Sequence, residues 1–238
     1  MRVIAIFFLA MAMAVFALPA QAQIKPPMDG YEVSITYSDG LERRMASINT
    51  MEQTFEDRFR ERRNDSRTFR EAGTQRFAKT QTEGTEWAGE RLIETVEGFT
   101  LDNLIKAMVA YNINRAAPDF RGKVEIGINS LKISNHNMAF LNSFQSYATG
   151  HIKVTDSGGA VLYDDKVTAN LVVNPTVDRS YDGPDLAFGE TEPSTRVGPT
   201  LAYFVERALR KVWPDNKDDI RGPIILRISG PNERVIFN

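Results

Sequence analysis

The residues best suited to metal chemistry lie in an acidic stretch between positions 174 and 198, which is rich in Pro, Gly and Asp. Positions 1, 3, 5 and 6 of an EF-hand calcium loop are matched by Asp178, Ser180, Asp182 and Gly183. The match then fails, because position 8 is acidic and position 12 is a glycine. Two hypotheses stay open. One is a looser calcium site, and the other is a polar connection whose Asp and Gly residues form turns, which we favour. The oxygen ligands of the calcium site would come from Asp178, Asp182, Asp185 and Glu190.

The chain offers little else that could perform catalysis. Its two histidines are His136, in a predicted loop, and His151, which has the polar parity of its predicted strand and is expected to face solvent. Neither has a second histidine within four residues, so a zinc site is poorly supported. The carboxylates of Asp215, Asp218 and Asp219 have no apolar surroundings to raise a pKa, and we expect them in a solvated turn. The chain has no cysteine, which excludes a thiol nucleophile, thiolate ligands and disulfides.

The elements that would position these residues are clearest from residue 98 onward. Two amphipathic helices are expected, one between the cap Thr100 and Pro118 and one between Pro199 and Pro214. Strands are predicted over 124–133, 148–154, 161–173 and 223–228. The apolar parity of the first strand shifts at Asn129-Ser130, which predicts a bulge, and a turn at 156–159 joins the next two strands.

This order of elements predicts an α+β fold. The helix is followed by three antiparallel strands, a second helix and a strand, and the simplest packing lays both amphipathic helices on one face of an antiparallel sheet. Strands that are adjacent in sequence argue against a doubly wound parallel sheet, which needs alternating strands and helices.

The N-terminal part differs in composition. Residues 31–37 alternate apolar and polar side chains as a half-buried strand does, and Asp39-Gly40 predicts a hairpin into 41–48. Residues 50–91 form a charged helical segment and loop, in which Met51, Phe55 and Phe59 recur as one apolar stripe. This helix either docks a partner or an anionic lipid face, or covers the hairpin as a salt-bridged helix. Because its local charges cancel, we favour the second interpretation.

The first 22 residues have the three parts of a secretion signal. Arg2 gives a positive start, Val3–Leu18 is uncharged and apolar, and Ala20-Gln21-Ala22 has the small residues of a cleavage site. The apolar stretch is shorter than the roughly 20 residues that a bilayer span needs. We therefore expect cleavage after Ala22 and a periplasmic or secreted protein with no transmembrane segment. The expected division is 1–22 signal peptide, 23–97 hairpin, charged helical segment and loop, and 98–238 α+β core domain.

Part of the chain resembles small exported envelope proteins. The block 124–173, with its Asp156-Ser157-Gly158-Gly159 turn, and the helix at 199–212 are similar to auxiliary lipoproteins of lipid-transport systems and to lipopolysaccharide-assembly lipoproteins. The similarity covers roughly residues 98–228 and carries over no functional residue. The chain departs from these families because it has no cysteine to be lipidated.

These observations predict an exported, soluble, non-enzymatic envelope protein that binds a protein or lipid partner. The 29 basic and 31 acidic side chains nearly cancel, so nothing indicates nucleic acid as a partner. No cofactor is expected apart from the calcium hypothesis. The alternative is a secreted hydrolase or metal-dependent enzyme, whose site would be assembled in space from scattered carboxylates and a histidine.

Overall fold

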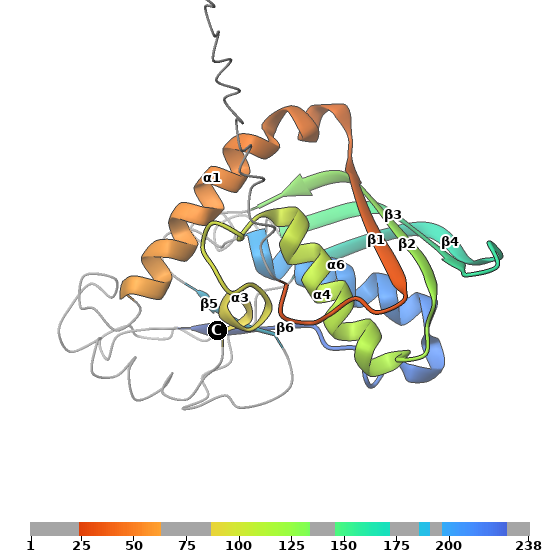
Figure 1. The fold of residues 1–238 in the computed structure, drawn as a ribbon. Helices are drawn as coiled ribbons and strands as arrows, with labels where there is room; N and C mark the ends of the chain where they lie inside the picture. Colours follow the sequence, from red (N-terminus) through yellow and green to blue (C-terminus); the bar gives the residue numbers. More distant parts are fainter. Residues whose placement is uncertain (1–23, 63–86, 134–145, 172–185, 191–196, 228–238) are drawn as a thin grey trace, which may run out of the picture.

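The structure, a computed structural model, describes residues 24–62, 87–133, 146–171, 186–190 and 197–227. These residues form a mixed α+β fold in which a four-stranded, mostly antiparallel sheet packs with several helices (Figure 1). The described elements are, in order, β1 (Tyr31–Tyr37), α1 (Asp39–Arg62), α3 (Ala88–Leu92), α4 (Leu101–Ala116), β2 (Gly122–Lys132), β3 (Ser146–Asp156), β4 (Val161–Leu171), β5 (Leu186–Glu190), α6 (Val197–Val212), the 3-10 turn η1 (Pro214–Asn216) and β6 (Pro223–Arg227).

The larger sheet has the strand order β1-β2-β3-β4. β2, β3 and β4 form an antiparallel meander, and β1 joins β2 in parallel. The pairing of β2 with β3 shifts between Ile128 and Ser130, which confirms the predicted bulge. The β3–β4 turn is also as predicted, because the carboxylate of Asp156 accepts hydrogen bonds from the main-chain N–H groups of Gly158 and Ala160, each at 2.9 Å.

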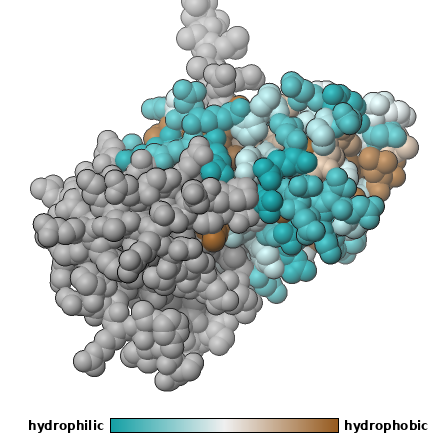
Figure 2. All heavy atoms as spheres, turned by 90° about the horizontal axis from the view of Figure 1, so that it is seen from below, coloured by the Kyte–Doolittle hydropathy of each residue, from teal (hydrophilic) through white to brown (hydrophobic). Residues whose placement is uncertain are grey.

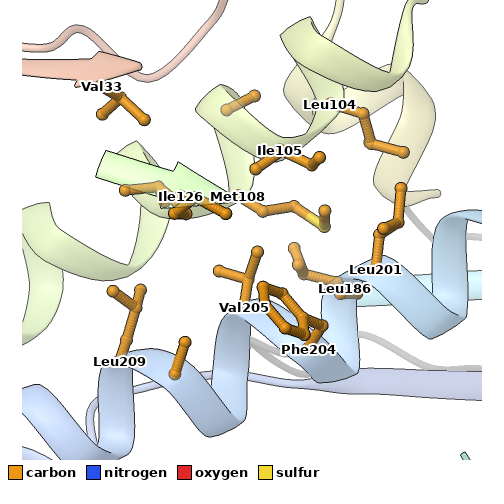
Figure 3. Packing of buried hydrophobic residues seen from close by; sticks show 14 of the residues in the cluster. Val33, Leu104, Ile105, Met108, Ile126, Leu186, Leu201, Phe204, Val205 and Leu209 are labelled. Atoms are coloured by element: carbon orange, nitrogen blue, oxygen red, sulfur yellow. The ribbon is translucent and has the colours of Figure 1, made fainter. Parts of the chain in front are cut away.

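The core is made of buried side chains from this sheet and from α4 and α6. Alternate side chains of β2 are buried, beginning with Val124 and Ile126, while the intervening side chains remain partly exposed. In Figure 3, Met108 of α4 and Val205 of α6 point toward one another, with Ile126 beside them. Both helices lie close to their predicted positions, and Thr100 caps α4 by accepting a hydrogen bond from the N–H of Asn103 at 3.2 Å.

One close approach between α6 and β3 depends on a glycine. A Cβ on Gly150 would collide with the main-chain oxygen of Gly127 on β2 and would lie 2.9 Å from Cζ of Phe204. Phe204 is fully buried on α6. The missing side chain at position 150 therefore leaves the space in which the Phe204 ring packs on the sheet.

The predicted N-terminal hairpin is wrong. Residues 39–62 form the helix α1 directly after β1, and β1 finds its partner in β2. The main-chain oxygen of Ser38 accepts hydrogen bonds from the N–H groups of Leu41 and Glu42, which begins the helix at the dipeptide that suggested a turn. Asp39 and Glu42 lie in the first turn, where negative charge is favourable to a helix.

α1 also packs through a face that its apolar pattern does not predict. Glu52 and Glu56 are each only 1% exposed, whereas Met51 of the predicted apolar stripe is 46% exposed. Phe55 is partly buried, and the side chain of Phe59 lies outside the described residues. The helix is charged as expected, but two of the side chains that it buries, Glu52 and Glu56, are acidic, and the apolar Met45 is buried with them.

A second sheet of two strands, β5 and β6, has no strand pairing with the larger sheet among the described residues. The last predicted strand, β6, pairs in parallel with β5 and not with the larger sheet. β5 itself lies inside the stretch 174–198, which was predicted as a polar connection, so that prediction is wrong for residues 186–190. Within the described ranges, no helix has the length and apolar character needed to cross a membrane.

Candidate functional site

A cleft of about 390 Å³ lies between the end of β1, the first half of α1 and the start of α4, and we call it the α1–β1–α4 cleft. This volume falls within the range of roughly 300–1,000 Å³ that is usual for ligand sites. The lining is mostly polar and consists of Ile35, Tyr37, Glu42, Met45, Asn49, Thr100, Asp102, Asn103 and Lys106.

Two hydrogen bonds between these elements, and one between α4 and the residues just before it, fix the walls of the cleft. The hydroxyl of Tyr37 on β1 donates to Oδ1 of Asp102 on α4 at 2.6 Å. Oδ1 of Asn49 on α1 accepts from the N–H of Leu101, the first residue of α4, at 2.9 Å. The amide of Asn103 donates to the main-chain oxygen of Gly98 at 2.9 Å. The cleft is therefore held open by its own framework and does not need a ligand to form.

The electrostatics of the cleft keep Tyr37 protonated. Burial raises the pKa of Tyr37 most, and the hydrogen bond to Asp102 and the negative charges of Asp102 and Glu42 raise the pKa further. A tyrosine with a raised pKa donates a hydrogen bond and does not act as a base near neutral pH. The arrangement suits binding better than proton abstraction.

Two charged side chains of the lining remain available to a ligand. Neither the carboxylate of Glu42 nor the ammonium of Lys106 forms an ion pair or a hydrogen bond with another described side chain or main-chain group. With Asp102, the lining has two carboxylates and one lysine, so its net charge is negative.

A second hollow, of about 310 Å³, lies along α6 and is lined by Tyr203, Glu206, Arg207, Arg210 and Lys211. Its cations already have partners. Arg210 pairs with Glu206 at 3.0 Å, Lys211 pairs with Asp165 of β4 at 3.3 Å, and the Arg207 guanidinium lies over the Tyr203 ring at 5.8 Å from its centroid. This hollow is the weaker candidate, because an anion would compete with these contacts.

The tip of the β3–β4 hairpin exposes apolar side chains. Val161 is 54% exposed and Leu162 is 51% exposed. Figure 2 shows an apolar patch at one end of a face that is otherwise largely hydrophilic where it is described. Two adjacent aliphatic side chains make a small patch, and surfaces of ordinary proteins carry comparable ones.

The calcium hypothesis falls mostly on residues that are not described. Asp178, Asp182 and Asp185 lie outside the described ranges, and Glu190 is the last residue of β5. Within the described part of the chain, no group of three or more His, Asp or Glu side chains is arranged to hold a metal ion.

The remaining predicted residues lie apart from the α1–β1–α4 cleft. Nε2 of His151 lies 2.6 Å from Oδ1 of Asp164, and the two side chains are 40% and 45% exposed, so the solvent-facing prediction is confirmed. His136 lies outside the described residues. Asp215, Asp218 and Asp219 are exposed at and after η1, which confirms a solvated turn.

Sequence reasoning missed the cleft because its residues come from three separate segments. Ile35 and Tyr37 were predicted only as strand residues and Thr100 only as a helix cap. Comparison of the chain with protein-family models, with curated proteins and with solved structures found no match.

Proposed function

We propose that this chain is an exported binding protein of the cell envelope, which holds a protein partner in the α1–β1–α4 cleft and catalyses no reaction. The observation that carries the proposal is the preformed cleft of about 390 Å³. Its framework groups are satisfied by one another, while Glu42 and Lys106 remain available for a partner. A binding site needs this combination of rigid walls and unpaired polar groups.

The lining favours a protein over a lipid as the partner. Ile35 and Met45 are its only aliphatic members, and Met45 is buried, so little apolar surface is offered to an acyl chain. Two carboxylates beside one lysine also disfavour an anionic headgroup. A polar protein segment fits both features.

We further infer that α4 and α6 cover the same face of the larger sheet. α6 contacts β3 and β4, and α4 contacts β1 and α6. Along both β2 and β3 the buried side chains are at alternate positions, so each strand buries one face. This packing supports the proposal because it places the start of α4 beside the end of β1, where the cleft lies.

Export rests on the N-terminal sequence and can be tested directly. The protein recovered from a periplasmic or culture fraction is expected to begin at Gln23. A chain that keeps Met1 in the cytoplasmic fraction would contradict export.

Partner binding can be tested by site-specific photo-crosslinking in the native envelope. A photoreactive amino acid at position 106, in the cleft, is expected to capture a protein. The same amino acid at the exposed position 217, in the turn after α6, serves as the matched control and is expected to capture none. Equal capture at both positions, or capture of lipid only at position 106, would overturn the proposal.

A further inference from the structure

The two edge strands of the larger sheet, β4 and β1, differ in whether their outward main-chain groups have hydrogen-bond partners. At the middle of the β4 edge, the main-chain N–H of Lys166 donates to the Asp165 carboxylate at 2.7 Å, and its C=O accepts from Nζ of Lys211 at 3.1 Å. Side chains therefore occupy the main-chain groups of Lys166, which another strand would need. Proteins commonly block an edge strand in this manner to prevent unwanted pairing.

The β1 edge has no such block among the described residues. In the pairing with β2, the N–H of Gly122 donates to the oxygen of Gly30, and the N–H of Ser38 donates to the oxygen of Ile128. The even-numbered residues of β1 therefore direct their main-chain groups toward β2. The odd-numbered residues 31, 33, 35 and 37 direct theirs away from it. No hydrogen bond joins these outward groups to another described residue.

This open edge borders the α1–β1–α4 cleft. Ile35 and Tyr37 are at once residues of the open edge and members of the cleft lining. The carboxylates of Asp102 and Glu42 both raise the pKa of Tyr37, which places negative charge near the end of the same strand. Main-chain donors and acceptors thus lie next to a negatively charged hollow.

We propose that an extended, basic segment of the partner adds to the open edge of β1 as a further strand and places a Lys or Arg side chain beside Glu42 and Asp102. The inference rests on the proposed function and specifies how the cleft is used. In strand addition, main-chain hydrogen bonds provide affinity and alternate side chains provide specificity. The net negative lining selects a cation for the side chain that enters the cleft.

The test uses the mature, ¹⁵N-labelled chain and a blocked octapeptide of alternating threonine and lysine. Amide hydrogen exchange at Val33, Ile35 and Tyr37 is expected to slow when this peptide is added, because these N–H groups gain partners. A peptide of alternating threonine and glutamate is expected to leave their exchange unchanged. Unchanged exchange with the lysine peptide at millimolar concentration, or equal slowing with both peptides, would overturn the proposal.

Two charge variants locate the basic side chain. Glu42→Gln removes a carboxylate from the cleft and is expected to weaken binding of the lysine peptide about three- to fivefold, as for a solvent-accessible ion pair. Glu32→Gln removes the same charge from the other face of β1 and is expected to leave binding unchanged. Equal effects of the two variants would refute the placement. If the photoreactive residue at position 106 captures a protein but the exchange of the β1 amides does not slow, only the strand-addition proposal fails. If position 106 captures no protein, the proposed function fails as well.

Discussion

Replacing Asn112 is expected to destabilise the fold strongly, although the residue lies on the apolar side of α4. The side chain is buried at 1% exposure. Its Oδ1 accepts from the N–H of Arg221 at 2.6 Å, and its Nδ2 donates to the C=O of Arg221 at 3.2 Å and to the C=O of Met108 at 3.0 Å. The side-chain amide of Asn112 thus bonds both main-chain groups of Arg221 and attaches the segment before β6 to α4.

The expected loss for Asn112→Ala follows from these contacts. Two hydrogen bonds to Arg221 contribute about 1 kcal/mol each, and leaving the partly buried N–H of Arg221 without a partner adds about 1 kcal/mol. The small cavity that remains adds to this loss. We therefore expect the free energy of unfolding to fall by about 3 kcal/mol, measured by urea denaturation of the mature chain.

Asn114→Ala is the matched control for this prediction. Asn114 lies two residues after Asn112 on α4 and is exposed. Its amide donates to the C=O of Pro27 and accepts from the hydroxyl of Tyr31. Exposed hydrogen bonds of this kind should cost less than about 1 kcal/mol when removed. An Asn112→Ala loss below about 1 kcal/mol, or equal losses for both variants, would refute the argument from burial and pairing.

Two further predictions concern a glycine and a tyrosine. Gly150→Ala should lower the free energy of unfolding by about 3 kcal/mol or prevent folding, because the new methyl group collides with the main chain of β2 and crowds Phe204. Gly40→Ala is the control, because nothing lies within 4 Å of its new methyl group, and it should leave the stability unchanged when both variants are compared by thermal melting. Burial raises the pKa of Tyr31 from 10.0 to about 12, so its contribution to stability is present below pH 10 and is lost as the pH rises from 10 to 12. The free energy of unfolding of Tyr31→Phe, measured by urea denaturation, should therefore fall less between pH 9 and 11 than that of the parent chain. An equal fall in both chains would contradict this.

The sequence predicted best those elements whose packing follows their own apolar pattern. α4, the β3–β4 hairpin and α6 each bury the face that their periodicity indicates, and their ends coincide with residues that act locally, such as Thr100 and Asp156. The bulge in β2 was visible because a one-residue shift moves every later side chain to the other face of a strand.

Pairing between distant segments could not be predicted in the same way. Asp39-Gly40 is a common hairpin dipeptide, but it opens a helix here because β1 pairs with β2, about 90 residues further along the chain, and not with its immediate successor. β5 was missed for a similar reason. It is only 5 residues long, and its partner β6 lies beyond α6, so neither its length nor its neighbours distinguish it from a loop.

The candidate site was invisible in the sequence because no local motif specifies it. Tyr37, Asn49 and Asp102 are ordinary residues in their own segments, and they gain a role only when β1, α1 and α4 meet. The motif-like patterns lay elsewhere. The one histidine–carboxylate contact that the structure describes, His151 with Asp164, is an exposed surface pair.

The inverted burial of α1 has a physical cause that connects these observations. The first N–H groups of a helix have no partner within it and carry partial positive charge. Asn49 accepts from the N–H of Leu101 at the start of α4, and Glu52 accepts from the N–H of Val197 at the start of α6, at 3.5 Å. One turn later, Glu56 pairs with Arg60, whose guanidinium donates to the main-chain oxygens of residues 93 and 94.

α1 therefore docks through polar acceptors directed at the ends of other helices, and its inner face needs few apolar residues. This explains why its sequence resembles a solvated, salt-bridged helix while Glu52 and Glu56 are among its most buried side chains. The same docking fixes α1 at the distance from β1 that leaves the cleft between them. A polar attachment at helix termini thus holds the helix in place and forms one wall of the α1–β1–α4 cleft.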